Sequence, residues 1–389
     1  MTHKVRVASL IASLVFLILL AVAGQAGAQS TPSPVAYVYV QIQGPDGAVY
    51  GFNASSAGHL SAIPGSPFKV TGTIIGATPT KFFTQGEDLL HSYSLSASGV
   101  IGSQLGQAPV FDYSGSGCGS AASGQNGAVL DHSGKYIYVL LQGGLGDCAA
   151  YQTYAINSDG SFSFAGDTEH FWAPLESGAG LPSILGNESF AYADHQAGSL
   201  EPTLSGFRRE SSGTLELTPI TVTLPTPLTG GSYTPVKPDA SPKGNYVILQ
   251  LYRDGSDTPQ IGTFTVDEQG NLSTTNTFTN MQPARWPHPS STFSPSGDFV
   301  VFYSGNGPNY QEGGTQAYRF TGASAVYPYL APGSIPTDQM EWDNSNHVYG
   351  LSTERNLIWV WYLTTSSTYL DQTYSLPIQS PYKMVVVSK

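Results

Sequence analysis

The amino-acid sequence predicts an all-β protein, a seven-bladed β-propeller with four antiparallel strands in each blade. Three observations lead to this fold class. The chain is rich in turn formers and aromatic residues, with 44 Gly, 27 Pro, 23 Tyr and 17 Phe among its 389 residues. Strand patterns of period two recur roughly every 40–50 residues, which is the length of a propeller blade. A surplus strand pattern stands at the C-terminal end of the chain.

The composition and charge exclude several other classes of protein. Charged residues make up 11% of the chain, against about a quarter in an ordinary soluble domain. A coiled coil or helical bundle needs many more Glu, Lys, Arg and Leu residues at helical spacing. A disordered chain lacks so many aromatic side chains. The formal net charge of −12 argues against a nucleic-acid partner.

The first 28 residues have the pattern of a secretory signal peptide. Lys4 and Arg6 give a positive start, an apolar run covers residues 7–23, and residues 26–28 (AGA) form a small-residue cleavage pattern. We expect residues 1–28 to be removed, which leaves residues 29–389 as a single propeller domain that is secreted or periplasmic. The alternative is a retained membrane anchor, although the apolar run is at the short limit for a span.

The repeat begins with a turn followed by an aromatic and β-branched strand. Each of three turns contains Gly at its fourth position, and a more divergent fourth copy has Asn there instead. The turns and the strands that follow them are 131–134 (DHSG) before 135–139, 241–244 (SPKG) before 245–249, 294–297 (SPSG) before 298–302, and 343–346 (DNSN) before 347–350. A turn residue of this kind followed by an alternating run indicates the start of a β-strand.

A second alternating pattern follows each of these strands and ends in a polar-Gly turn and a short strand. Residues 48–52 lead to 57–60 in this way, and residues 261–266 lead to 268–272. Each copy therefore supplies four strands, A to D, as a propeller blade does. The seven copies lie near residues 36–70, 71–107, 126–168, 181–224, 233–280, 286–332 and 335–376.

The two ends of the chain are predicted to share one blade. The first copy has no A strand before Val35, whereas residues 381–387 form a strand pattern after the last copy. The C-terminal strand can therefore complete the first blade, which closes the ring and removes exposed sheet edges. A sandwich would not repeat seven times, and a solenoid would not need this exchange of a terminal strand.

The only two cysteines fall on the same face of the predicted propeller. Cys118 lies in the connection from the second to the third blade, and Cys148 lies between strands B and C of the third blade. In an exported protein such a pair favours a disulfide bond. Two free thiols are the alternative, and two cysteines are too few for a four-thiolate zinc site.

The segment 36–40 (AYVYV), the turn 56–60 (SAGHL) and the tail 65–68 (GSPF) resemble the propeller lactonase family, also called 6-phosphogluconolactonase-like, which is related to the YVTN-repeat propellers. The resemblance covers essentially the whole chain after the leader. It implies a propeller that hydrolyses a lactone, which is an intramolecular ester. The matching residues are strand and turn residues, so the function must be argued from a site.

Polar residues in the D-to-A and B-to-C connections are the candidates for a site, because these connections meet at one face around the central channel. We expect catalytic residues among His195, Arg253, Arg285, His288 and Glu354, and substrate-binding residues among His170, Trp172, Trp286 and Arg355. A His or Glu can act as general base on water, and an Arg can stabilise the oxyanion. Each of these residues could instead have no role in a site: it could be an ordinary solvated loop residue or, in the case of Trp286, a residue that fills a gap in the packing. Glu341 and Lys383, on predicted inner strands, could also line the channel.

Two classes of function therefore stay open at this point. The first is a carboxylic-ester hydrolase acting on a small lactone at the channel mouth, preferably a neutral one because the chain is acidic. The second is a non-catalytic binding or scaffold propeller that recognises a surface glycan, a cell-wall component or a protein. In either case we expect a monomer that needs no cofactor or metal and that contacts neither nucleic acid nor, after signal cleavage, a membrane.

Overall fold

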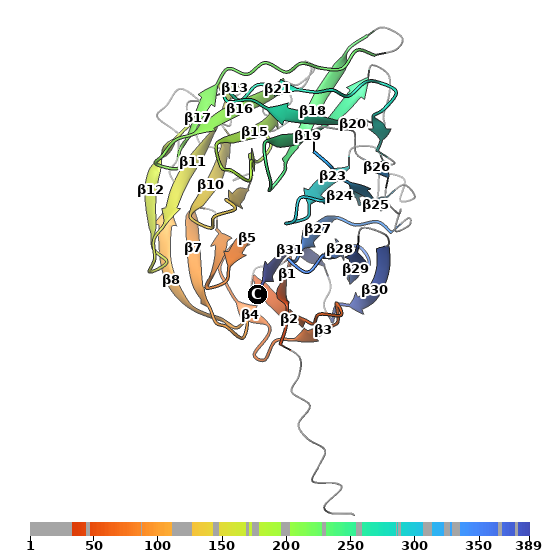
Figure 1. The fold of residues 1–389 in the computed structure, drawn as a ribbon. Coiled ribbons are helices and arrows are strands. Elements are labelled where there is room, and N and C mark those ends of the chain that lie inside the picture. Colours follow the sequence, from red (N-terminus) through yellow and green to blue (C-terminus); the bar gives the residue numbers. More distant parts are fainter. Residues whose placement is uncertain are drawn as a thin grey trace, which may run out of the picture. The chain divides into compact units, whose positions relative to one another are not determined.

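The described residues of the computed structural model form a ring of seven antiparallel sheets, as the sequence predicts (Figure 1). The model describes residues 33–43, 47–86, 88–110, 127–142, 148–168, 171–172, 179–195, 203–227, 231–253, 259–284, 286, 289–305, 313–322, 327–328, 335–364, 368–377 and 380–389. Contacts divide the chain into Met1–Ser33 and the compact unit Pro34–Lys389, which holds the whole ring. Within the described ranges no helix has the length and apolar character needed to cross a membrane.

The first three blades follow the predicted boundaries closely. The first is β31 (Pro381–Ser388), β1 (Ala36–Ile42), β2 (Ala48–Ala54) and β3 (Leu60–Ala62), with β4 (Phe68–Lys69) also paired to β2. The second is β5 (Thr73–Thr78), β6 (Lys81–Gln85), β7 (Leu89–Leu95) and β8 (Ile101–Pro109). The third is β9 (Ala128–Leu130), β10 (Tyr136–Gln142), β11 (Cys148–Ile156) and β12 (Phe162–Asp167), with β13 (Phe171–Trp172) also paired to β11.

The remaining four blades repeat the same order from the inner to the outer strand. The fourth is β14 (Ser183–Ile184), β15 (Phe190–His195), β16 (Thr203–Arg209) and β17 (Leu215–Thr218). The fifth is β18 (Tyr233–Ala240), β19 (Tyr246–Arg253), β20 (Gln260–Val266) and β21 (Leu272–Ser273), with β22 (Gln282–Pro283) paired to β20. The sixth is β23 (Ser290–Phe293), β24 (Phe299–Ser304), β25 (Gly314–Arg319) and β26 (Tyr327–Pro328). The seventh is β27 (Gln339–Trp342), β28 (His347–Ser352), β29 (Leu357–Leu363) and β30 (Thr368–Ser375).

Tyrosines of the second strand in several blades bind the next blade and explain part of the aromatic composition. The buried hydroxyls of Tyr39, Tyr138 and Tyr192 donate to the carbonyl oxygens of Gly99, Gly213 and Gly270, at 2.7, 2.8 and 2.9 Å respectively. These three glycines stand in the hairpin turn of the following blade and have φ between 79° and 90°. A side chain there would meet both backbone strain and an aromatic ring. Part of the Gly and Tyr content is therefore explained by these contacts between neighbouring blades.

The closing strand pairs the two ends of the propeller along its full length. Strand β31 runs antiparallel to β1, with Val38 opposite Val386 and Tyr39 opposite Val385. The neighbouring side chains Val40 and Met384 are buried in the core between the first and seventh blades. This arrangement confirms that the surplus C-terminal strand supplies the inner strand of the first blade.

Deletion of residues 381–389 is expected to abolish cooperative folding, because it exposes the edge of β1 and opens the ring. Thermal melting followed by circular dichroism, together with size-exclusion chromatography, would show aggregated protein without a sharp transition. Deletion of residues 1–28 is the control, and it should preserve the melt because Pro34–Lys389 form a compact unit by themselves. A truncated protein that melts like the control would show that the closing strand is dispensable.

Candidate functional site

His195 ends β15 with its ring already engaged by neighbouring hydroxyls. Its Nε2 lies 2.7 Å from the hydroxyl oxygen of Thr203, and its Nδ1 lies 3.5 Å from that of Ser205. The residue is 8% exposed, and burial lowers the pKa of the imidazole, with the charge of Asp194 opposing that shift. These contacts favour a neutral imidazole that ties β15 to β16.

The side chains of Arg253 and Trp286 both pack against neighbouring residues of the fold. The guanidinium of Arg253, at the end of β19, lies 5.9 Å from the centre of the Phe278 ring. The side chain of Trp286 is buried, and its indole covers the backbone of Gly314, where a Cβ atom would lie only 2.1 Å from the ring. Trp286 therefore fills the space that Gly314 leaves open.

The other rim residues are spread over separate blades. Glu354 and Arg355 are exposed in the turn between β28 and β29. Trp172 lies on β13, where its Cα pairs with that of Cys148. Trp172 therefore belongs to the third blade, His195 to the fourth and Arg253 to the fifth, and the turn with Glu354 and Arg355 belongs to the seventh. His170, Arg285, His288 and Cys118 lie outside the described residues.

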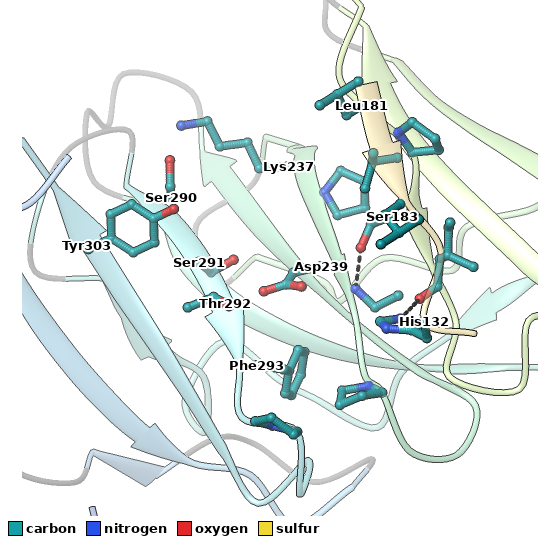
Figure 2. A pocket seen from close by; sticks show the side chains of 18 residues that line it. His132, Leu181, Ser183, Lys237, Asp239, Ser290, Ser291, Thr292, Phe293 and Tyr303 are labelled. Carbon is teal, nitrogen blue, oxygen red and sulfur yellow. Dashed lines mark hydrogen bonds between the residues drawn. The ribbon is translucent and has the colours of Figure 1, made fainter. Parts of the chain in front are cut away.

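A cavity of about 700 Å³ runs along the inner strands of the third to sixth blades, where the propeller has its central channel. This volume is within the range of small-molecule sites. Figure 2 shows the side chains that line it, which come from β9, β14, β18, β23 and β24 and from residues next to these strands. The cavity reaches from Leu181 and Ser290, near the starts of inner strands, to turns at their other ends that contain His132 and Pro295.

A bulge in β18 shapes the polar part of the cavity. Between Val236 and Asp239 the strand gains one residue relative to β19, where the partners are Gln250 and Ile248. Lys237 within the bulge has φ 46°, and its backbone N–H donates to Asp194 Oδ2 at 3.0 Å. A bulge redirects side chains at functional positions in many sheets. Here both Lys237 and Asp239 extend from β18 toward β23 (Figure 2).

The carboxyl group of Asp239 is poised to titrate near neutral pH. Burial raises its pKa to about 7, and a hydrogen bond from the Ser291 side chain offsets only part of that shift. Its Oδ2 atom is buried and has no hydrogen-bond partner among the described residues. A carboxyl with this pKa is a good general base at physiological pH.

Lys237 supplies a positive charge on the same wall. Its Nζ donates to the carbonyl oxygen of Pro289 at 3.0 Å, and the side-chain amide of Gln250 donates to the same oxygen at 2.7 Å. Burial lowers the pKa of the ammonium group, while the charge of Asp194 opposes this. The carbonyl of Pro289 thus holds the ammonium at the wall of the cavity, on the side of Ser290 of the next blade (Figure 2).

Tyr303 and Glu341 extend this group of polar side chains toward the seventh blade. Burial raises the pKa of the Tyr303 phenol, and the charges of Glu341 and Asp239 raise it further. Burial also raises the pKa of Glu341, against the side-chain amide of Gln339, which donates to it at 2.9 Å, and the charge of Lys383. The phenol of Tyr303 therefore stays protonated and can donate a hydrogen bond in the cavity.

Together these groups can perform acid–base chemistry on a small ligand. A carboxyl with a pKa near 7, a lysine and several hydroxyl groups line one side of a cavity. The described residues contain no cluster of three or more His, Cys, Asp or Glu side chains placed to hold a metal ion. The sequence reading pointed to Glu341 and Lys383 as inner-strand residues but missed Asp239, Lys237 and Tyr303. The signal available for Asp239 and Lys237 was the segment 235–239 (PVKPD), where two prolines and two charged residues interrupt an inner strand.

Asp239 should leave a signature in the pH dependence of stability. Its pKa is about 7 in the folded state, against about 3.9 in an unfolded chain. The folded state therefore binds the proton of Asp239 more tightly than the unfolded chain does. The stabilisation that results is fully present below about pH 4 and is lost as pH rises through 7. Between pH 4 and 8 the free energy of unfolding of the wild type should therefore decrease by on the order of 2–4 kcal/mol more than that of Asp239→Asn.

Urea denaturation at a series of pH values measures this effect. Asp298→Asn changes an exposed carboxylate in the sixth blade and serves as the control, which should keep the slope of the wild type. Parallel curves for the wild type and Asp239→Asn would contradict a raised pKa at Asp239.

Comparison with known proteins supports the fold. No family model matches the chain, and no curated protein matches it. Among solved structures, a proposed 6-phosphogluconolactonase from Bacteroides uniformis has a TM-score of 0.60 at 12% identity, over 90% of this chain and 99% of that one. The periplasmic gluconolactonase of Pseudomonas aeruginosa has a TM-score of 0.59 at 14% identity, over 91% and 99% of the two chains. A protein from Lactobacillus plantarum has a TM-score of 0.56 at 12% identity, over 90% and 98%. This chain therefore has the seven-bladed propeller fold of solved structures that include proteins described as gluconolactonases.

Proposed function

We propose that the protein is an extracytoplasmic lactonase that hydrolyses its substrate in the central cavity. The observation that carries this proposal is the carboxyl group of Asp239, which has a pKa of about 7, a buried oxygen without a partner among the described residues, and a place on the wall of a ligand-sized cavity. The leader-like residues 1–28 and the fold shared with a periplasmic gluconolactonase support the location and the reaction class.

In the proposed mechanism Asp239 first accepts a proton and later donates it. Ionised Asp239 accepts a proton from a water molecule, whose oxygen attacks the carbonyl carbon of the lactone. The resulting oxyanion is stabilised by the positive charge of Lys237 and by hydrogen bonds from hydroxyl groups such as that of Tyr303. The ring C–O bond then breaks, and Asp239 returns its proton to the departing alkoxide. The product is a hydroxy acid, which ionises in solution.

A panel of lactones tests this function. D-glucono-δ-lactone, γ-butyrolactone and γ-octalactone are incubated with the protein, and acid release is followed by titration at constant pH. We expect release above the uncatalysed background with at least one of them. No release with folded protein would overturn the lactonase proposal and leave a binding propeller as the better description.

A further inference from the structure

The two sides of the central cavity differ in chemistry, and this difference indicates the class of substrate. We propose that the cavity takes a neutral lactone whose ring carries an alkyl chain, with the chain lying along β9 and β14. This inference rests on the proposed function and specifies its substrate. The ring is placed at Asp239 on β18, opposite the apolar side (Figure 2).

The apolar side is built from the third and fourth blades. Five of its side chains have no polar atoms, namely those of Val129, Leu130, Leu181, Pro182 and Ile184. Leu181 is 36% exposed, which makes it one of the few large apolar side chains at the surface of the described residues. It covers Gly127, with its nearest carbon 3.5 Å from the position of a Cβ there. An alkyl chain laid against this side would remove exposed apolar surface from water.

The two polar side chains on the same side are already used by the fold. His132 Nε2 lies 2.8 Å from the carbonyl oxygen of Ile184. The hydroxyl oxygen of Ser183 accepts the backbone N–H of Ala240 at 2.7 Å. Both interactions appear as dashed lines in Figure 2. A sugar ring placed here would lose hydrogen bonds to water that these groups are poorly placed to replace.

The opposite side fixes the orientation and disfavours an anionic substrate. Lys237, Ser290, Ser291 and Tyr303 lie there with Asp239, so the hydrogen-bonding groups gather where the ester group must react. Asp239 lines this side of the cavity, and Glu341 lies on the inner strand β27 of the seventh blade; the charges of both raise the pKa of the Tyr303 phenol. A phosphate group would meet Asp239 and Glu341 as well as the single positive charge of Lys237, in a chain of net charge −12. A neutral alkyl lactone avoids that repulsion.

The test compares lactones of increasing chain length at the same ring. We expect kcat/KM to rise by roughly two- to fourfold for each methylene from γ-butyrolactone to γ-octalactone, because each methylene adds burial against the apolar side. D-glucono-δ-lactone should be a poorer substrate than γ-octalactone. Leu181→Ser should lower kcat/KM for γ-octalactone about three- to tenfold more than for γ-butyrolactone.

Leu105→Ser is the matched control, because Leu105 is 39% exposed on the outer strand β8, away from the cavity lining. It should leave the chain-length dependence unchanged. Hydrolysis of D-glucono-δ-lactone with no gain along the alkyl series would overturn the substrate class and leave the lactonase function intact. If no lactone is hydrolysed, the proposed function fails, and calorimetry of γ-butyrolactone and γ-octalactone with Asp239→Asn decides the inference separately. Tighter binding of the longer chain would support the alkyl site, and equal or undetectable binding would overturn it.

Discussion

Asp239→Asn is expected to lower kcat/KM for lactone hydrolysis by about 10²–10⁴-fold, the usual contribution of a general base. The amide keeps the size of the side chain but cannot accept the proton of the attacking water. The variant should fold, because its native environment already favours the uncharged form of this group. Kinetic measurements on the best substrate of the lactone panel provide the rates.

The controls separate a catalytic from a structural role for Asp239. Asp239→Glu restores a carboxylate in the cavity and should recover part of the activity. Asp298→Asn makes the same chemical change at an exposed site and should have no effect. An Asp239→Asn protein with wild-type kcat/KM would remove Asp239 from the mechanism, whatever its effect on stability.

Arg209→Ala is expected to destabilise the propeller by about 3–5 kcal/mol, because it leaves a buried carboxylate without its charged partner. Arg209 Nη2 lies 2.9 Å from Asp131 Oδ2, and the side chains of these two residues are 8% and 0% exposed. The guanidinium also pairs with Glu188 and lies 4.8 Å from the centre of the Tyr136 ring. Arg209 thus joins the fourth blade to a turn of the third.

The neighbouring Arg208 provides the control for this substitution. It is exposed, and its guanidinium lies 5.7 Å from the centre of the Phe190 ring, so Arg208→Ala should cost less than about 1 kcal/mol. Urea denaturation at neutral pH measures both variants. A loss below about 1 kcal/mol for Arg209→Ala would mean that its ion pairs with Asp131 and Glu188 add little to stability.

The architecture could be predicted from the sequence because it depends on local, repeated signals. Turns such as 294–297 are needed to start a strand, and the surplus segment 381–387 had no partner within its own copy. Each of these signals depends on a few neighbouring residues. The strand pattern of a blade recurs in seven copies, so an error in one copy does not change the fold.

The candidate site was only partly accessible from the sequence, since it depends on side-chain direction. Glu341 could be placed on an inner strand because the seventh copy is regular. Lys237 and Asp239 were missed because the bulge in β18 breaks the period-two pattern that such a reading follows. Tyr303 was missed because it belongs to a second strand, β24, yet lines the cavity. Rim residues such as Arg253 drew attention by their charge alone, which does not reveal whether a side chain lines a cavity.

The pH dependence of kcat/KM for lactone hydrolysis tests the central claim most directly. If Asp239 is the general base, the rate should rise about tenfold per pH unit below neutrality and level off above an apparent pKa of about 7. Asp239→Asn should lose both the rate and this transition, while Asp298→Asn should keep both. A wild-type profile that is flat across pH 5–8, or a transition that persists in Asp239→Asn, would contradict the account.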